Sequence, residues 1–80
     1  MEAKTREELL AMYEQVGKFT VEGLAQARKG KEWFHIRIDG SPAYEKRFDW
    51  VGPFSNGQAV AHEGVAEILI DTKGEQVFLN

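Results

Sequence analysis

The sequence predicts a mainly β fold, in which one N-terminal α-helix is followed by two tandem antiparallel β-hairpin repeat units of about 34 residues each. Three observations support this prediction. A helix-capping signal precedes a short apolar stripe, regularly placed glycines divide the rest of the chain, and the stretches YEQVGKFTVEGLAQA and FDWVGPFSNGQAVA read almost alike. We expect residues 1–80 to form a single domain.

The helix is predicted from its capping signal and its apolar spacing. Thr5 followed by Glu8 matches the capping box, in which the hydroxyl and the carboxylate satisfy free amides at a helix start. A stripe with three- and four-residue spacing follows, and Gly17 provides a stop. We therefore expect a helix from about 6 to 15, with an apolar stripe formed by Leu9, Leu10, Met12, Tyr13 and Val16.

After Gly17 the pattern changes to that of short strands. The segments EWFHIRID, EILID and QVFLN are rich in β-branched and aromatic residues. Between them, IDGS and DTKG are typical of hairpin turns, in which Gly40 and Gly74 would supply the positive φ that such turns require.

The two similar stretches extend into a repeat of the whole β region. The copies align with an offset of 35, which becomes 34 after a one-residue insertion at Val21. The first unit spans residues 13–47 and the second spans residues 48–80. The identical pairs are Val16/Val51, Gly17/Gly52, Phe19/Phe54, Gly23/Gly57, Ala25/Ala59, Ala27/Ala61, Gly30/Gly64, Ile36/Ile70 and Gly40/Gly74.

Comparison of the copies separates structural positions from free ones. Phe34 and Ile36 match isoleucines in the second copy, so they are predicted to face the core. The alternate positions Trp33, His35 and Arg37 match Glu67, Leu69 and Asp71, which share nothing with them. This second set is expected to point away from the core.

Composition excludes several functional classes. Ten Lys and Arg against thirteen Asp and Glu give a net charge of −3, which argues against a nucleic-acid partner. The absence of cysteine excludes disulfides and thiolate chemistry. No apolar run is long enough to cross a membrane, and if this is the full-length chain we expect a cytoplasmic protein. No cofactor is predicted.

The repeated residues resemble the bacterial WG-repeat proteins, whose unit reads roughly V-G-x-F-x-x-G-x-A-x-V, then G-K-W-G-Y-I-D, a turn and a closing strand. The resemblance covers residues 13 to 80. The tryptophan is kept only as Trp33, where WFHI replaces WG. At the aligned positions the I-D pair is kept only as Ile70-Asp71, because Arg37 replaces the Asp in the first copy. The resemblance implies a β-hairpin repeat that acts as an interaction or scaffold module, and it supplies no catalytic residues.

Binding residues are expected where the two copies differ, namely at Trp33, His35, Arg37 and Trp50. The simpler interpretation is that the aromatic rings complete the core, and that His35 and His62 are exposed. Two less favoured hypotheses are a metal site joining both histidines with Asp39 or Glu63, and a glycosidase-like pair formed by Asp49 with Asp39 or Glu45.

The leading functional hypothesis is a non-enzymatic interaction or scaffold module that binds a protein partner or associates with itself. The alternative is a cell-wall glycan-binding module that uses Trp33 and Trp50, and a small hydrolase is a remote third hypothesis. In a stacked repeat each unit buries its face on the next. The helix is expected to cover one end, and an open sheet edge near Val77 and Leu79 would lead to dimerisation or reflect excision from a longer array.

Overall fold

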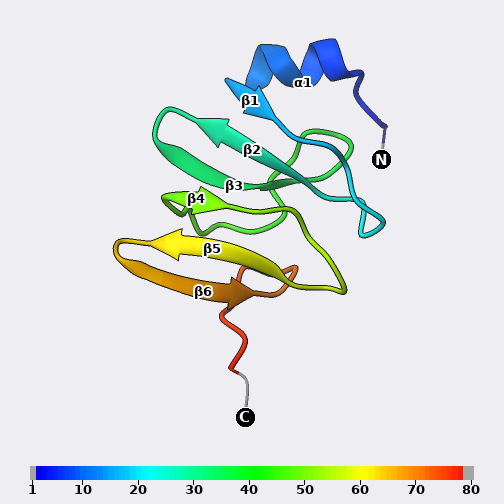
Figure 1. The fold of residues 1–80 in the computed structure, drawn as a ribbon. Coiled ribbons are helices and arrows are strands. Elements are labelled where there is room, and N and C mark those ends of the chain that lie inside the picture. The colour runs from blue at the N-terminus through cyan, green and yellow to red at the C-terminus, as the bar shows by residue number, and fades with distance from the viewer. Residues whose placement is uncertain (1, 79–80) are drawn as a thin grey trace.

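The computed structural model describes residues 2–78. One helix and two three-stranded antiparallel sheets follow one another in chain order along the molecule, so that α1 and the C-terminal segment lie at opposite ends (Figure 1). The elements are α1 (Arg6–Met12), β1 (Gln15–Val16), β2 (Ala25–Lys29) and β3 (Glu32–Ile36), then β4 (Trp50–Val51), β5 (Ala59–Glu63) and β6 (Ala66–Ile70).

The two sheets repeat the same pairing, which confirms the tandem units. Ala25 lies opposite Ile36 across β2 and β3, and the matched residues Ala59 and Ile70 lie opposite each other across β5 and β6. The turn glycines also match, because Gly40 and Gly74 have φ values of 87° and 76°. Each copy of the repeated sequence therefore specifies the same three strands and the same turns.

The helix begins as predicted but is shorter. Thr5 and Glu8 form the complete capping box, and α1 ends at Met12 instead of Gln15. Tyr13 is already extended, and Gln15 pairs with Arg28 in the first sheet. The prediction of residues 13–15 as helical was wrong. The apolar spacing continues beyond Met12, but the backbone there is extended and begins to pair with β2.

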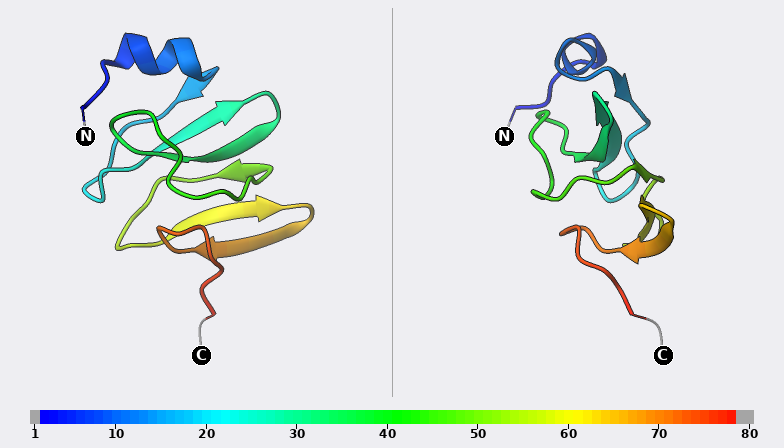
Figure 2. Two further views of the ribbon diagram at one scale, coloured as in Figure 1. Left: turned by 180° about the vertical axis from the view of Figure 1, so that it is seen from behind. Right: turned by 90° about the vertical axis from the view of Figure 1, so that its left-hand side faces the viewer.

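Each unit closes with a short segment that returns along its third strand. Pro42 bridges to Ile36 in the first unit, and Gln76 bridges to Ile70 in the second. A further bridge, between Trp33 and Phe48, joins the first sheet to the segment leading into β4. These closing segments lie beside the sheets in the view turned by 90° (Figure 2, right).

The core combines the predicted face of β3 with a face that was not predicted to be buried. Phe34 and Ile36 are buried, as expected, together with Val51 and Phe54 of the second unit. His35 is also buried, with 0% of its surface exposed. The expectation that His35 points away from the core into solvent was wrong, because the second unit covers the other face of β3.

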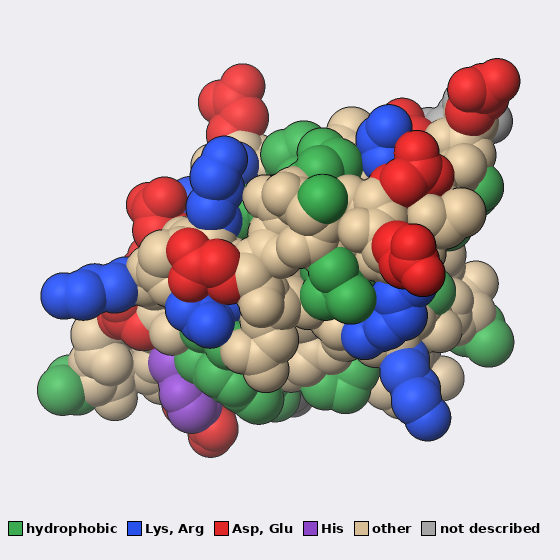
Figure 3. Space-filling view, turned by 90° about the horizontal axis from the view of Figure 1, so that it is seen from above, with side chains coloured by type: hydrophobic (Ala, Val, Ile, Leu, Met, Phe, Trp, Pro, Cys, Tyr) green, Lys and Arg blue, Asp and Glu red, His purple; other side chains and the backbone are tan. Residues whose placement is uncertain are grey.

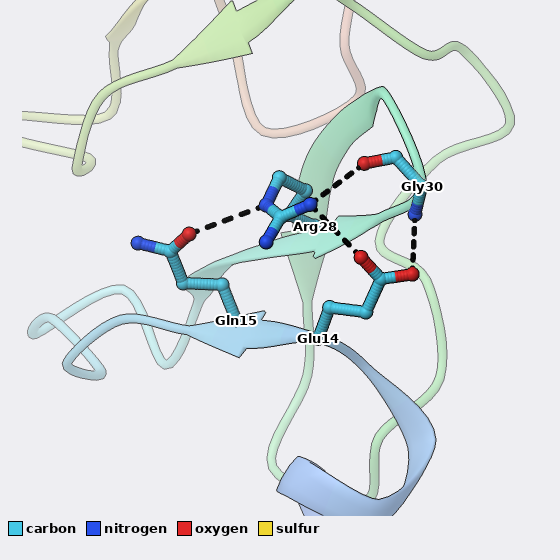
Figure 4. A network of polar contacts seen from close by, with 4 residues as sticks. All are labelled: Glu14, Gln15, Arg28 and Gly30. Carbon is cyan, nitrogen blue, oxygen red and sulfur yellow. Dashed lines mark hydrogen bonds and ion pairs between the residues drawn. The ribbon is translucent and has the colours of Figure 1, made fainter.

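A polar network fastens the start of the first unit to its β2–β3 hairpin (Figure 4). Glu14 accepts from the Gly30 amide at 3.0 Å and pairs with the Arg28 guanidinium at 2.9 Å. The second unit repeats the first of these contacts, since Asp49 accepts from the Gly64 amide at 2.7 Å. An acidic residue before the first strand thus holds the turn of the following hairpin in both copies.

The charged surface seen from the α1 end carries basic and acidic side chains interspersed, without a continuous basic region on that face (Figure 3). Among residues 2–78, none of the helical structure has the length and apolar character of a membrane span.

Candidate functional site

Side chains of the first unit bind backbone carbonyls at the start of the second. Gln26 and His35 are cross-strand partners on β2 and β3. Gln26 Nε2 donates to the Val51 carbonyl at 3.2 Å, and His35 Nε2 lies 2.8 Å from the Gly52 carbonyl oxygen. Two consecutive backbone carbonyl groups of the second unit therefore accept hydrogen bonds from side chains of the first unit.

The second ring nitrogen of His35 is also occupied. Nδ1 lies 2.7 Å from the hydroxyl of Tyr44, in the closing segment of the first unit. A carbonyl can only accept, so Nε2 carries the proton and Nδ1 accepts from the Tyr44 hydroxyl. Burial lowers the pKa of His35 from 6.5 to about 4, so the neutral ring is the stable form. His35 is thus a structural residue of the junction.

Helix α1 makes the corresponding contacts at the other end of the first unit. Arg6 donates to the carbonyls of Val16 and Gly17, the repeat counterparts of Val51 and Gly52. The guanidinium therefore pairs with these two carbonyls of the first unit, as Gln26 and His35 pair with the matching carbonyls of the second. The helix stands in the place of a preceding unit and closes that end of the stack.

Packing over the matched turn glycines also shows that α1 covers the first unit as the first unit covers the second. A methyl group added at Gly40 would meet Met12 at 3.0 Å and Leu9 at 3.2 Å, both from α1. At Gly74 it would meet the Tyr44 ring at 2.7 Å. Leu9 is buried as the helix lid was expected to be, whereas Leu10 and Met12 remain largely exposed.

The second unit presents different chemistry at the positions that form the junction in the first. The counterparts of Gln26, His35 and Tyr44 are Val60, Leu69 and Phe78, all three hydrocarbon side chains. Val60 and Leu69 are cross-strand partners on β5 and β6. We call the surface formed by Val60, Leu69 and Phe78 the end face.

The end face is exposed where its counterpart is covered. Tyr44 is 8% exposed, because it lies between His35 and the turn at Gly74, whereas its counterpart Phe78 is 79% exposed. Val60 and Leu69 are half-buried, while His35 is fully buried. Within residues 2–78, nothing covers this face as the second unit covers the first.

One predicted binding residue lies beside the end face. Trp50 is 38% exposed and its ring centroid lies 5.0 Å from that of His62, its cross-strand partner. His62 and Val60 alternate on β5 and so share one side of the sheet. His62 also contacts the Glu67 carboxylate at 3.3 Å, and the row of Trp50, His62 and Glu67 forms a polar-aromatic border of the end face.

The other predicted residues lie elsewhere. Trp33 is half-buried against the core, and His35 belongs to the junction. Arg37 is exposed and donates to the Pro42 carbonyl at 2.8 Å. It lines a hollow of about 390 Å³ between the loops of the two units, whose other lining residues are Glu22, Leu24, Ala43, Thr72 and Lys73.

Three of the side chains considered for metal binding or hydrolysis, those of His35, Asp39 and Asp49, hold local structure. Both ring nitrogens of His35 are engaged, and the Asp49 and Asp39 carboxylates accept from the amides of Gly64 and Ser41. In the described part of the chain, no group of three or more His, Cys, Asp or Glu residues is placed to hold a metal ion.

An open sheet edge was predicted near Val77 and Leu79. The Val77 amide donates to the Leu69 carbonyl at 2.8 Å, so this segment still pairs with β6. Leu79 lies outside the described residues.

Comparison with known proteins agrees with the paired architecture. A model of the WG containing repeat matches residues 7–33 and again residues 36–61, which together make up more than half of the chain. The chain belongs to the WG containing repeat family. The first match runs from α1 through β1 and β2 to the start of β3, and the second runs from the end of β3 through the closing segment and β4 into β5. No curated protein and no solved structure matches the chain.

The three residues of the end face were not among the predicted binding residues, although the repeat contained a signal for them. In the WG repeat alignment, Gln26, His35 and Tyr44 are each replaced by a purely apolar residue in the second unit. In the first unit these three positions are adjacent, so the changes replace a polar contact surface with an apolar one in the second unit. The sequence alone does not show that these positions meet, because they lie on two strands and a closing segment.

Proposed function

We propose that this WG repeat protein is a non-enzymatic interaction module that binds a protein partner through its end face. The observation that carries the proposal is the contrast between Tyr44, which is covered, and Phe78, which is 79% exposed at the matched position. Exposed apolar clusters with a polar border are typical of protein interaction sites. The end face has that composition, with Val60, Leu69 and Phe78 beside the border of Trp50, His62 and Glu67.

The arrangement favours contact through the face over contact along the strand edge. Glu67 takes the place of Trp33, which in the first unit bridges to Phe48. A charged side chain on an edge strand opposes pairing with another strand. A partner is therefore expected to pack on the side chains of Val60, Leu69 and Phe78.

Site-specific cross-linking tests this proposal. A benzophenone side chain at Leu69, exposed to an extract of the source cells, is expected to form an adduct of discrete mass. The same group at Val65, a fully exposed residue between β5 and β6, serves as the control. The adduct at position 69 should disappear when V60Q and F78Y make the face polar. Equal adducts at positions 65 and 69, or an adduct indifferent to V60Q and F78Y, would contradict the proposal.

Glycan binding is the alternative, and the exposed ring of Trp50 favours it. Aromatic faces stack on apolar surfaces of ligands while their polar edges remain hydrated, and Trp50 is held by its tilted contact with His62. Binding to peptidoglycan or a polysaccharide array that is lost in W50A and kept in V65A would support this alternative. Binding that is unchanged in W50A, or absent in the unaltered protein, would reject it.

A further inference from the structure

We infer that the partner of the end face is a second copy of this chain, packed face to face about a two-fold axis. This inference rests on the proposed function and names the partner for the same surface. Three features support it: the missing hydrogen-bond donors of the end face, the closed state of the opposite end, and the self-complementary chemistry of the face.

The end face lacks the donors that a further repeat unit would need. In the first unit, Gln26 and His35 donate hydrogen bonds to the Val51 and Gly52 carbonyls of the next unit. A third unit docked in the same way would place its equivalent carbonyls against Val60 and Leu69, which have no donor to offer. Burial of unpaired carbonyl groups is unfavourable. The end face is therefore suited to a hydrocarbon surface and not to the backbone edge of another repeat.

Helix α1 closes the opposite end of the molecule to a repeat-type contact. There, Arg6 already occupies the Val16 and Gly17 carbonyls, and Leu9 of α1 is buried over Gly40. Copies therefore cannot stack head to tail as the two units do without displacing the helix. An isologous contact, in which the same patch on both copies meets itself, needs no such displacement and closes at two subunits.

The end face is chemically complementary to itself. Val60, Leu69 and Phe78 carry no charge and need no hydrogen-bond partner, so two such faces can meet without unpaired polar groups. The polar side chains of His62 and Glu67, on this side of the sheet, contact each other at 3.3 Å within one copy. Burial of apolar surface thus drives the association, and the polar-aromatic border stays at the rim of the interface.

Sedimentation velocity and light scattering of the purified full chain, from micromolar to millimolar concentration, test this inference. We expect a monomer–dimer equilibrium that does not proceed beyond the dimer. The triple variant V60Q, L69H and F78Y copies the junction residues of the first unit onto the end face. It is expected to weaken the association constant by at least about tenfold. V65T, altered outside the face, should dimerise like the unaltered chain. Far-UV circular dichroism verifies folding, and L69Q replaces the triple variant if that variant unfolds.

The outcomes separate this inference from the proposed function. A monomer at millimolar concentration overturns the dimer, as do open-ended growth and a folded polar variant that dimerises as tightly as the original. If the chain is monomeric but the cross-link at position 69 still forms a discrete adduct with another protein, only the identity of the partner is wrong. If both dimer and adduct are absent, the proposed function fails as well.

Discussion

The Nε2 atom of His35 lies 2.8 Å from the carbonyl oxygen of Gly52, and this contact joins the first repeat unit to the second. The ring is fully buried and receives a second hydrogen bond from the Tyr44 hydroxyl at 2.7 Å. A residue that differs between the two copies thus holds the copies together. The matched residue, Leu69, lies on the exposed end face.

Replacement of His35 by Leu should destabilise the protein strongly. The substitution keeps an apolar body but leaves the buried Gly52 carbonyl and Tyr44 hydroxyl without their partner. Each orphaned buried group costs about 1–3 kcal/mol, and we expect a loss of about 3 kcal/mol in the free energy of unfolding, measured by urea denaturation. The reverse substitution at the matched position, L69H, should cost less than about 1 kcal/mol because Leu69 is half-exposed. Equal losses would contradict the assignment of the junction.

The stability of the protein should fall as the pH drops from about 6.5 to about 4. Burial lowers the pKa of His35 from 6.5 to about 4, so in this range the unfolded chain binds a proton that the folded chain does not. The free energy of unfolding therefore decreases on acidification, by roughly 3 kcal/mol in total from this residue. Below about 4 its contribution no longer changes.

H35Q provides the control for this pH dependence. A glutamine amide can donate to Gly52 and accept from Tyr44, but it does not titrate. Urea denaturation of both proteins at several pH values should show that the free energy of unfolding of the unaltered protein falls by roughly 3 kcal/mol relative to that of H35Q as the pH drops from 6.5 to 4. Curves that stay parallel would show that His35 is not responsible.

Alanine at Gly74 should be more harmful than alanine at Gly64. Both glycines have positive φ, 76° and 61°, so both substitutions carry a similar backbone strain of about 1 kcal/mol. A methyl group at Gly74 would also meet the Tyr44 ring at 2.7 Å, whereas a methyl group at Gly64 would have no neighbouring atom within 4 Å. We expect G74A to cost about 1–3 kcal/mol more than G64A in thermal or urea unfolding. Similar losses would argue against close packing of Tyr44 on this turn.

Removal of the Arg6 guanidinium should loosen α1 from the first sheet. R6M keeps an unbranched side chain but removes the donors to the Val16 and Gly17 carbonyls. The expected loss is about 1–2 kcal/mol for two partly exposed hydrogen bonds. Amide hydrogen exchange of α1 should become faster while that of β5 and β6 is unchanged. K18M, which removes an exposed cation, is the matched control, and an equal effect of both changes would contradict the capping role.

The elements with strong local signals were predictable. The capping box of Thr5 and Glu8 and the turns at Gly40 and Gly74 formed as expected, because each is defined by contacts within a few residues. The end of α1 was predicted three residues too late, since strand pairing between Gln15 and Arg28 competes with the helix there. The local residue pattern cannot predict that Gln15 pairs with a strand residue thirteen positions later in the chain.

The candidate site was only partly predictable. Comparison of the copies directed attention to variable positions, and Trp50 does lie beside the end face. The same comparison placed His35 among exposed residues, whereas it is buried against Gly52. The copies show which positions vary, but not whether a neighbouring unit covers them.

By itself the sequence determined the repeat, the turns and the apolar face of each strand, because these follow from glycine conformation, side-chain alternation and local capping. Only the tertiary structure decided that Gln26, His35 and Tyr44 meet at one junction, and that the matched residues Val60, Leu69 and Phe78 are not covered in that way. The physical reason is that burial depends on which unit packs against which face, and hydrogen bonds between units join residues far apart in the chain.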